Sequence, residues 1–230
     1  MVAENIKNIR EKVAKACFRI GRDPQSVELI AVSKTFETDK ILEGFSAGLL
    51  DFGENYVQEL AEKRNALIQN PIRWHFIGHL QSNKVKYIAD WIHLIHSVDS
   101  EGLAAEIDKR AQKSGRMIDV LIEVNTSEES TKFGVKPAKT MDLIRHVNGF
   151  QHLNLKGLMT IGPFTDNKDE SRAAFTVLKN IFDTANSQTI LRQPMTVLSM
   201  GMTHDYEIAI EQGSTMIRIG TAIFGSRIKQ

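Results

Sequence analysis

The chain has 230 residues, of which 42% are hydrophobic and 25% charged, and its formal net charge at pH 7 is +1. This balance is typical of a soluble globular protein. No long basic or acidic run is present, so we expect no binding to nucleic acid or to a membrane surface. The only cysteine is Cys17, which excludes an internal disulfide and a cysteine-based zinc site.

The amino-terminal stretch "MVAENIKNIREKVAKACF" mixes charged and apolar residues at helical spacing, which predicts an amphipathic helix. It lacks the continuous apolar core of a signal peptide. No segment has the roughly 18 successive apolar residues of a membrane-spanning helix. We therefore expect a cytoplasmic protein.

The rest of the chain alternates short apolar runs with amphipathic stretches of helical length. The runs predict buried strands, with 51–55 the weakest, at 27–33, 51–55, 74–78, 92–98, 118–125, 155–161, 195–201 and 215–225. The amphipathic stretches predict helices at 38–48, 56–68, 100–114, 137–148, 169–187 and 204–212. In the fifth helix, a four-residue repeat predicts a buried stripe of Ala173, Val177, Ile181 and Ala185.

About eight strand–helix units at roughly 30-residue spacing indicate a parallel sheet covered by helices. This count and the chain length favour an α/β fold of the (β/α)8 barrel type with an extra amino-terminal helix. The alternative is an open doubly wound sheet, but no G-x-G-x-x-G motif follows the first strand. Since no flexible linker interrupts the pattern, we expect a single domain over residues 1–230.

Active sites of such barrels lie where the strands end and the following loops begin. The loops after the seventh and eighth strands commonly bind phosphate through backbone N–H groups. In this sequence, Ser199 and Gly201 follow the seventh strand, and Gly220 and Thr221 follow the core of the eighth. These residues predict a phosphate site, although ordinary turn glycines would give the same pattern.

Two basic residues also stand near strand ends. Lys34 follows the first strand, and a lysine amine in a dry pocket can form a Schiff base with an aldehyde. The alternative is a lysine whose amine extends to solvent. Arg218 precedes "IGT" within an apolar run, so its guanidinium is a candidate to face a ligand ring nitrogen, or to pair with a strand neighbour such as Glu123.

Other chemistries are not indicated. His75, His79, His93 and His96 are scattered, with no H-E-x-x-H motif, so we expect no metal site. No G-x-S-x-G nucleophile motif is present.

Six motifs in order carry a specific resemblance. They are "AVSKT", "FGENYVQE", "WHFIGHLQSNK", "GLMTIG", "SMGMTHDYEIAI" and "STMIRIGTAIFG". Together they resemble the pyridoxal-phosphate homeostasis protein family, also called proline synthetase co-transcribed homologues, from about Ile30 to Gly225. That family is similar in fold to the barrel domain of alanine racemase.

The resemblance implies the vitamin B6 cofactor pyridoxal 5′-phosphate (PLP). It implies that Lys34 holds the cofactor as a Schiff base and that Arg218 faces the pyridine nitrogen. It also implies that Asn55 lies near the ring. The phosphate would be held by Ser199, Gly220 and Thr221, with Gly201 beside them.

Two functions compete. A racemase or decarboxylase of this fold class needs a second acid–base group opposite the lysine, usually from a second domain, and no candidate is evident here. The sequence therefore favours a protein that binds PLP and releases it, with apo PLP-dependent enzymes as candidate recipients and no residue assigned to catalysis. In those enzymes the second domain also forms a dimer interface. Since we see no second domain in this sequence, we expect a monomer.

Overall fold

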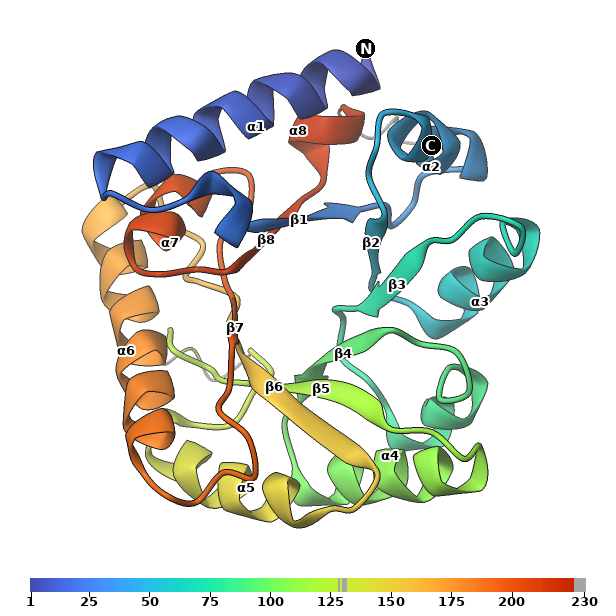
Figure 1. Cartoon of the computed structure of the whole chain (residues 1–230), viewed down its shortest axis with the longest axis vertical. Coiled ribbons are helices and arrows are strands. Elements are labelled where there is room, and N and C mark those ends of the chain that lie inside the picture. Colours follow the sequence, from blue (N-terminus) through green and yellow to red (C-terminus); the bar gives the residue numbers. More distant parts are fainter. Residues whose placement is uncertain (128, 130–131, 226–230) are drawn as a thin grey trace.

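The computed structural model describes residues 1–127, 129 and 132–225, and within them eight parallel strands close into a barrel, β1-β2-β3-β4-β5-β6-β7-β8. Figure 1 shows the strands as an inner ring surrounded by helices. The strands are β1 (Glu28–Val32), β2 (Asp51–Glu54), β3 (Arg73–Phe76), β4 (Leu94–Val98), β5 (Ile118–Glu123), β6 (Leu153–Met159), β7 (Val197–Ser199) and β8 (Met216–Ile219). The predicted (β/α)8 barrel is confirmed, and β2, the weakest prediction, is one of its strands. Residues 226–230 of the expected single domain lie outside the described residues.

The helices follow the predicted order. They are α1 (Val2–Arg19), α2 (Thr38–Ser46), α3 (Val57–Ala66), α4 (Glu101–Lys113), α5 (Pro137–Gly149), α6 (Lys168–Ser187), α7 (Tyr206–Glu211) and α8 (Thr221–Phe224), with two 3₁₀ helices, η1 (Pro24–Ser26) and η2 (Ser82–Tyr87). Figure 1 shows the extra helix α1 across the outside of the barrel beside α7 and α8. None of the helices in the described part of the chain is both long and apolar enough to cross a membrane.

Two expectations about elements were wrong. The strand expected over 215–225 ends at Ile219, because Thr221–Phe224 turn into the short helix α8. The apolar stripe expected on α6 is only partly the buried face, since Ala185 is buried whereas Ala173 and Val177 are exposed. A four-residue repeat drifts around a helix of 3.6 residues per turn. The buried face is instead centred on Phe175 and Leu178.

Two apolar layers hold the barrel. Outward side chains of the strands pack against the helices in one large core, whereas a smaller cluster fills the barrel interior with Ile30, Leu94, Leu121, Met159 and Met216. Because successive strand residues face opposite sides, the inward positions of each strand are fixed by one register. The pairing of β1 with β8 sets Ile30 opposite Arg218 and Ala31 opposite Ile219. The ends of these two strands therefore meet at one mouth of the barrel.

Candidate functional site

A cavity of about 380 Å³ opens at the carboxyl ends of the strands. Of the seven predicted site residues, five line it, namely Lys34, Asn55, Arg218, Gly220 and Thr221. They come from the ends of β1, β2 and β8, which the closed sheet brings together. We call this hollow the mouth cavity.

The turn that carries Lys34 is strained and firmly anchored. Thr35 has a φ of 68°, a left-handed conformation that is uncommon for a residue other than glycine. The backbone N–H of Thr35 donates to Glu59 Oε1 at 2.5 Å. Lys63 Nζ donates to the Ser33 carbonyl at 2.7 Å. These bonds fix the backbone on both sides of Lys34.

A buried ion cluster supports this turn from the helix layer. Lys63 Nζ lies 2.7 Å from Glu54 Oε1 and 2.6 Å from Glu59 Oε1, and Ser33 Oγ also donates to Glu54 at 2.7 Å. Burial raises the pKa of Glu54 although Lys63 lowers it in part. Glu54 is therefore costly to ionise without the lysine beside it.

Arg218 crosses the floor of the mouth cavity. Its Nη1 donates to Ser199 Oγ at 2.7 Å and its Nη2 donates to the Thr160 carbonyl at 2.8 Å. Burial lowers the pKa of Arg218 to about 10, partly offset by the negative charges of Asp205 and Glu123. The guanidinium thus remains charged at neutral pH and is a donor only. Such a group beside a pyridine nitrogen leaves that nitrogen without a proton.

Glu123 lines a neighbouring cavity that shares Asn55 with the mouth cavity. Its pKa is raised to about 7 by burial and by the negative charge of Asp99, while Arg218 acts in the opposite direction. No hydrogen bond between Glu123 and Arg218 is among the interactions of the described residues, so the expected direct ion pair is replaced by a longer-range attraction. Arg218 is instead held by Ser199 and a carbonyl group.

Ser199 and Gly201 do not line the mouth cavity. Ser199 is fully buried, and its hydroxyl accepts from Arg218 and lies 3.0 Å from His96 Nδ1. Gly201 has a φ of 97°, and an added Cβ would come within 2.6 Å of Ala209 Cβ. Ser199 therefore supports Arg218 from below, and Gly201 allows α7 to pack closely against the end of β7.

A second hydroxyl at the mouth was missed in the sequence. Thr203 lines the cavity, and its Oγ1 lies 3.5 Å from Thr221 Oγ1. Both residues flank the loops after β7 and β8, where barrels commonly bind phosphate. "SMGMT" contains a second hydroxyl residue four positions after Ser199, and that was the available signal.

Within the described part of the chain, Asn55 has an unpaired polar atom beside the mouth cavity. Its side-chain Oδ1 is buried and has no hydrogen-bond partner among the described residues. Buried polar atoms are nearly always paired. Because Asn55 also lines the mouth cavity, this oxygen is available to a donor group of a bound molecule.

A column of polar side chains continues from Arg218 through the barrel interior. His96 Nε2 lies 3.0 Å from His75 Nδ1, and His75 Nε2 lies 3.0 Å from Asp51 Oδ1. Burial, together with the neighbouring groups His75 and Arg218, holds the pKa of His96 well below its usual range. We call Arg218, Ser199, His96, His75 and Asp51 the interior column. It connects the mouth with the opposite end of the barrel.

With both imidazoles neutral, the two ends of the column impose one proton order. Arg218 can only donate to Ser199, and the Asp51 carboxylate can only accept from His75. Ser199 O–H then donates to His96 Nδ1, and His96 Nε2–H donates to His75 Nδ1. Burial alone would raise the pKa of Asp51, but hydrogen bonds from His75 and Arg73 lower it overall.

The comparison with protein families agrees with this geometry. The family model for the amino-terminal domain of alanine racemase matches residues 2–228. A solved alanine racemase from Clostridium difficile has a TM-score of 0.73 at 13% identity, with 99% of this chain and 58% of that chain covered. At this identity the likeness concerns the fold alone.

Much closer relatives share nearly the whole length. The pyridoxal phosphate homeostasis protein of Aquifex aeolicus is 43% identical over 224 residues, which are 97% of each chain. That of Escherichia coli K12 is 38% identical over 230 residues, which are 98% of this chain and 97% of the relative.

A solved relative carries the cofactor. PipY of Synechococcus elongatus PCC7942, determined with PLP bound, superimposes with a TM-score of 0.86 at 34% identity and covers 98% of this chain and 100% of its own. These relatives are similar to this chain over nearly its full length, and the mouth of its barrel contains both Lys34 and Arg218. The chain belongs to the pyridoxal phosphate homeostasis protein family.

Proposed function

We propose that this protein binds PLP in the mouth cavity, holds it as a Schiff base on Lys34, and releases it without significant amino-acid turnover. The main support is that Lys34 and Arg218 line one cavity in which the buried Asn55 Oδ1 has no partner among the described residues. A related protein of the family has been solved with PLP bound.

Each residue has a proposed role. Thr221 and Gly220, with Thr203, bind the phosphate at the start of α8, where the first N–H groups of a helix have no intrahelical partner. Arg218 faces the ring nitrogen, and Asn55 lies near the ring, where its Oδ1, unpaired among the described residues, is an acceptor.

The two remaining predicted residues act from behind the cavity. Ser199 orients Arg218 through the bond to Nη1. Gly201 provides the close turn between β7 and α7, and its carbonyl accepts the Arg218 backbone N–H at 3.0 Å.

The site favours storage over turnover. PLP supplies an electron sink for amino-acid chemistry, and the sink is strongest when its ring nitrogen is protonated. Arg218 remains a charged donor and has no proton to give up at neutral pH. The close relatives are named homeostasis proteins and not enzymes.

Borohydride reduction of the PLP-loaded protein, followed by peptide mapping, tests the lysine assignment. We expect the label on Lys34 and its loss in Lys34→Ala. Lys84→Ala is the matched control, because Lys84 lines a neighbouring cavity that shares Asn55. A label on Lys84, or unchanged labelling of Lys34→Ala, would contradict the assignment.

The alternative function is a PLP-dependent racemase or decarboxylase. We expect no racemisation or decarboxylation of amino acids at an ordinary enzyme rate, which is about 1 per second or more. The assay is chiral chromatography of each amino acid after incubation with loaded protein. Turnover at that rate would overturn the carrier function.

The proposal extends to surroundings and partners. A cytoplasmic location, a monomeric state and delivery of PLP to apo PLP-dependent enzymes stay predictions. Sedimentation velocity measures the monomer directly. Activation of an apo enzyme by loaded protein, in the presence of a trap for free PLP, distinguishes direct delivery from release into solution.

A further inference from the structure

Two imidazoles and a carboxylate meet at the end of the barrel opposite the mouth. Asp51 begins β2, His75 lies in β3, and His93 directly precedes β4. One ligand atom from each lies within 4.8 Å of the other two. Asp51 and His75 are buried, whereas His93 is exposed. Their sequence positions are far apart, and only the parallel register of β2, β3 and β4 brings them together.

We propose that Asp51, His75 and His93 bind a divalent transition-metal ion of the zinc class. Two imidazole nitrogens and one carboxylate oxygen are a donor set that Zn²⁺ accepts, with a fourth position for water. Ligands at about 2.0–2.2 Å from one tetrahedral ion lie roughly 3.3–3.6 Å apart. His75 Nε2 and Asp51 Oδ1 are 3.0 Å apart, so they would separate by a few tenths of an ångström as the ion replaces the proton between them.

The groups around the ligands suit this role. A metal-bound histidine almost always donates its other ring N–H to a fixed acceptor. His75 Nδ1 lies 3.0 Å from His96 Nε2, and His96 is fully buried and available as that acceptor. Metal binding therefore requires no new partner for His75.

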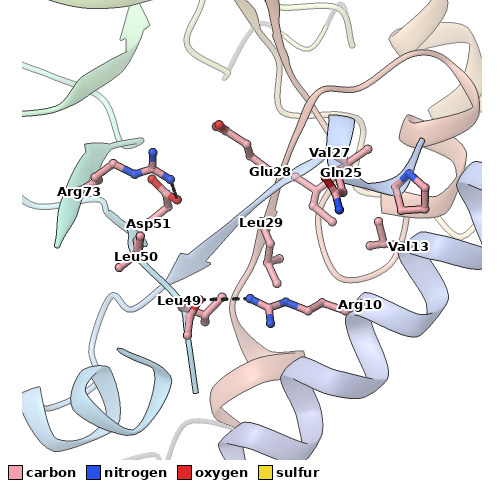
Figure 2. Close-up of a pocket in the computed structure, with 13 residues that line it drawn as sticks. Arg10, Val13, Gln25, Val27, Glu28, Leu29, Leu49, Leu50, Asp51 and Arg73 are labelled. Carbon is pink, nitrogen blue, oxygen red and sulfur yellow. Dashed lines mark hydrogen bonds and ion pairs between the residues drawn. The ribbon is translucent and has the colours of Figure 1, made fainter. Parts of the chain in front are cut away.

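Arg73 is the group that opposes a cation here. It pairs with Asp51 Oδ2, which leaves Oδ1 directed at His75. Figure 2 shows Arg73 and Asp51 facing each other on the wall of a cavity of about 400 Å³, with Glu28 also on its lining. The side chain of Arg73 is 43% exposed, so water screens its charge, and Glu28 adds a compensating negative charge. Arg73 then orients the carboxylate ligand from outside.

Metal binding at this site would change the hydrogen bonds of the interior column up to Ser199, near the mouth. With the ion on His75 Nε2, the remaining proton sits on Nδ1 and points at His96 Nε2. His96 then carries its own proton on Nδ1 and donates to Ser199 Oγ. The proton order of His75 and His96 is reversed, and Ser199 Oγ then accepts from both Arg218 and His96, so its own hydroxyl proton needs another acceptor.

The test uses the full chain with any affinity tag removed and with metal stripped by a chelator. Titration with Zn²⁺ by calorimetry, and with Co²⁺ by visible absorption, is expected to show one ion per chain. His93→Ala should weaken binding by more than about tenfold, the lower end of losses seen even for residues behind the ligands. His146→Ala, an exposed histidine on α5, is the matched control and should bind as the wild type does.

The experiment distinguishes loss of a metal ligand from misfolding of the variant. His93 is exposed, so a thermal melt of His93→Ala should match that of the wild type and exclude misfolding as the cause of any loss. Absence of binding to the wild type, or equal binding by His93→Ala, would overturn the site. In long-range ¹H–¹⁵N spectra of histidine-labelled protein, Zn²⁺ should move the His75 proton from Nε2 to Nδ1, and an unchanged spectrum would also overturn it. No cofactor enters these measurements, so they are independent of the proposed PLP binding.

Discussion

Replacing Lys63 by methionine tests the ion cluster beneath the Lys34 turn. The side chain of Lys63 is 8% exposed and that of Glu54 is fully buried, so methionine preserves the packing but removes the charge that Glu54 contacts. Breaking a buried ion pair by removing one partner typically costs about 3–5 kcal/mol. Glu59 is less affected, because its side chain is 24% exposed and can be hydrated.

The magnitude has an upper limit set by protonation of Glu54. In the variant, Glu54 can avoid a buried, unpaired charge by binding a proton. Protonating a carboxyl group with an unfolded pKa of about 4.3 costs about 1.36 kcal/mol for each pH unit above that value. At pH 7 the cost is roughly 3.7 kcal/mol. We therefore expect a loss of about 3–4 kcal/mol at pH 7. The loss of the lysine raises the folded-state pKa of Glu54 further. A raised pKa gives stability that is present at low pH and disappears as pH rises, so the loss should shrink to about 1 kcal/mol at pH 5, where the same protonation limit applies.

Urea unfolding followed by circular dichroism at pH 5 and pH 7 measures both values. Lys179→Met is the matched control, because Lys179 and Asp183 form an exposed pair on α6 that should contribute under about 0.5 kcal/mol. Adding Glu54→Gln to Lys63→Met should abolish the pH dependence. A loss below about 1 kcal/mol at pH 7, or an equal loss at both pH values, would refute the reasoning.

Three further results are expected. Glu123 has a folded pKa of about 7 against about 4.3 when unfolded. Between pH 5 and pH 8 the wild type should therefore lose about 2–3 kcal/mol of stability relative to Glu123→Gln, measured by urea unfolding. A stability difference that stays constant with pH would contradict this burial effect. Gly201→Ala should destabilise the protein by about 1–3 kcal/mol, because Gly201 has a φ of 97° and an added Cβ would come within 2.6 Å of Ala209. The control is Gly102→Ala on α4, where an added Cβ meets open space, and it should be neutral or slightly stabilising. Thermal melts measure both. Thr221→Val should weaken the equilibrium binding of PLP more than that of pyridoxal. Ser199→Ala acts through Arg218 and should weaken the binding of both compounds alike. The reverse pattern would exchange the roles of the two residues.

The sequence was sufficient to predict the barrel and to name five of the residues that line its mouth cavity. Apolar runs at regular spacing identify parallel strands, and closure of such a sheet necessarily brings their carboxyl ends together. Lys34 and Thr221 come from opposite ends of the chain, yet both line the mouth cavity. That juxtaposition follows from the pairing of β1 with β8, which the strand count already implied.

What the sequence did not predict is the direction of individual side chains. β7 has only three residues, so one step along it decides between the mouth and the interior. Ser199 points into the interior, and the hydroxyl at the cavity belongs to Thr203. A residue type near a strand end therefore indicates the neighbourhood of a site, whereas its role depends on the pleat and the following turn.

The interior column was missed for a different reason. His75 and His96 looked scattered because they belong to different strands, and their separation in sequence carries no sign of the 3.0 Å contact between their rings. The available signal was their position inside otherwise apolar strands. A polar residue at an inward position needs a polar partner inside the barrel, and His75 and His96, on the adjacent strands β3 and β4, pair with each other.

The column also links the two ends of the molecule energetically. A buried polar chain is stable only when every member is paired, and here the terminal groups have opposite charges, Arg218 at the mouth and Asp51 at the other end. Each neutral member between them carries a hydrogen-bond direction set by both termini. A change that reorients His75 must therefore reach Ser199 through His96, since no ring can reverse its donor and acceptor alone. For this reason a change at the opposite end of the barrel can reach the hydrogen bond between Ser199 and Arg218 without contact with the mouth.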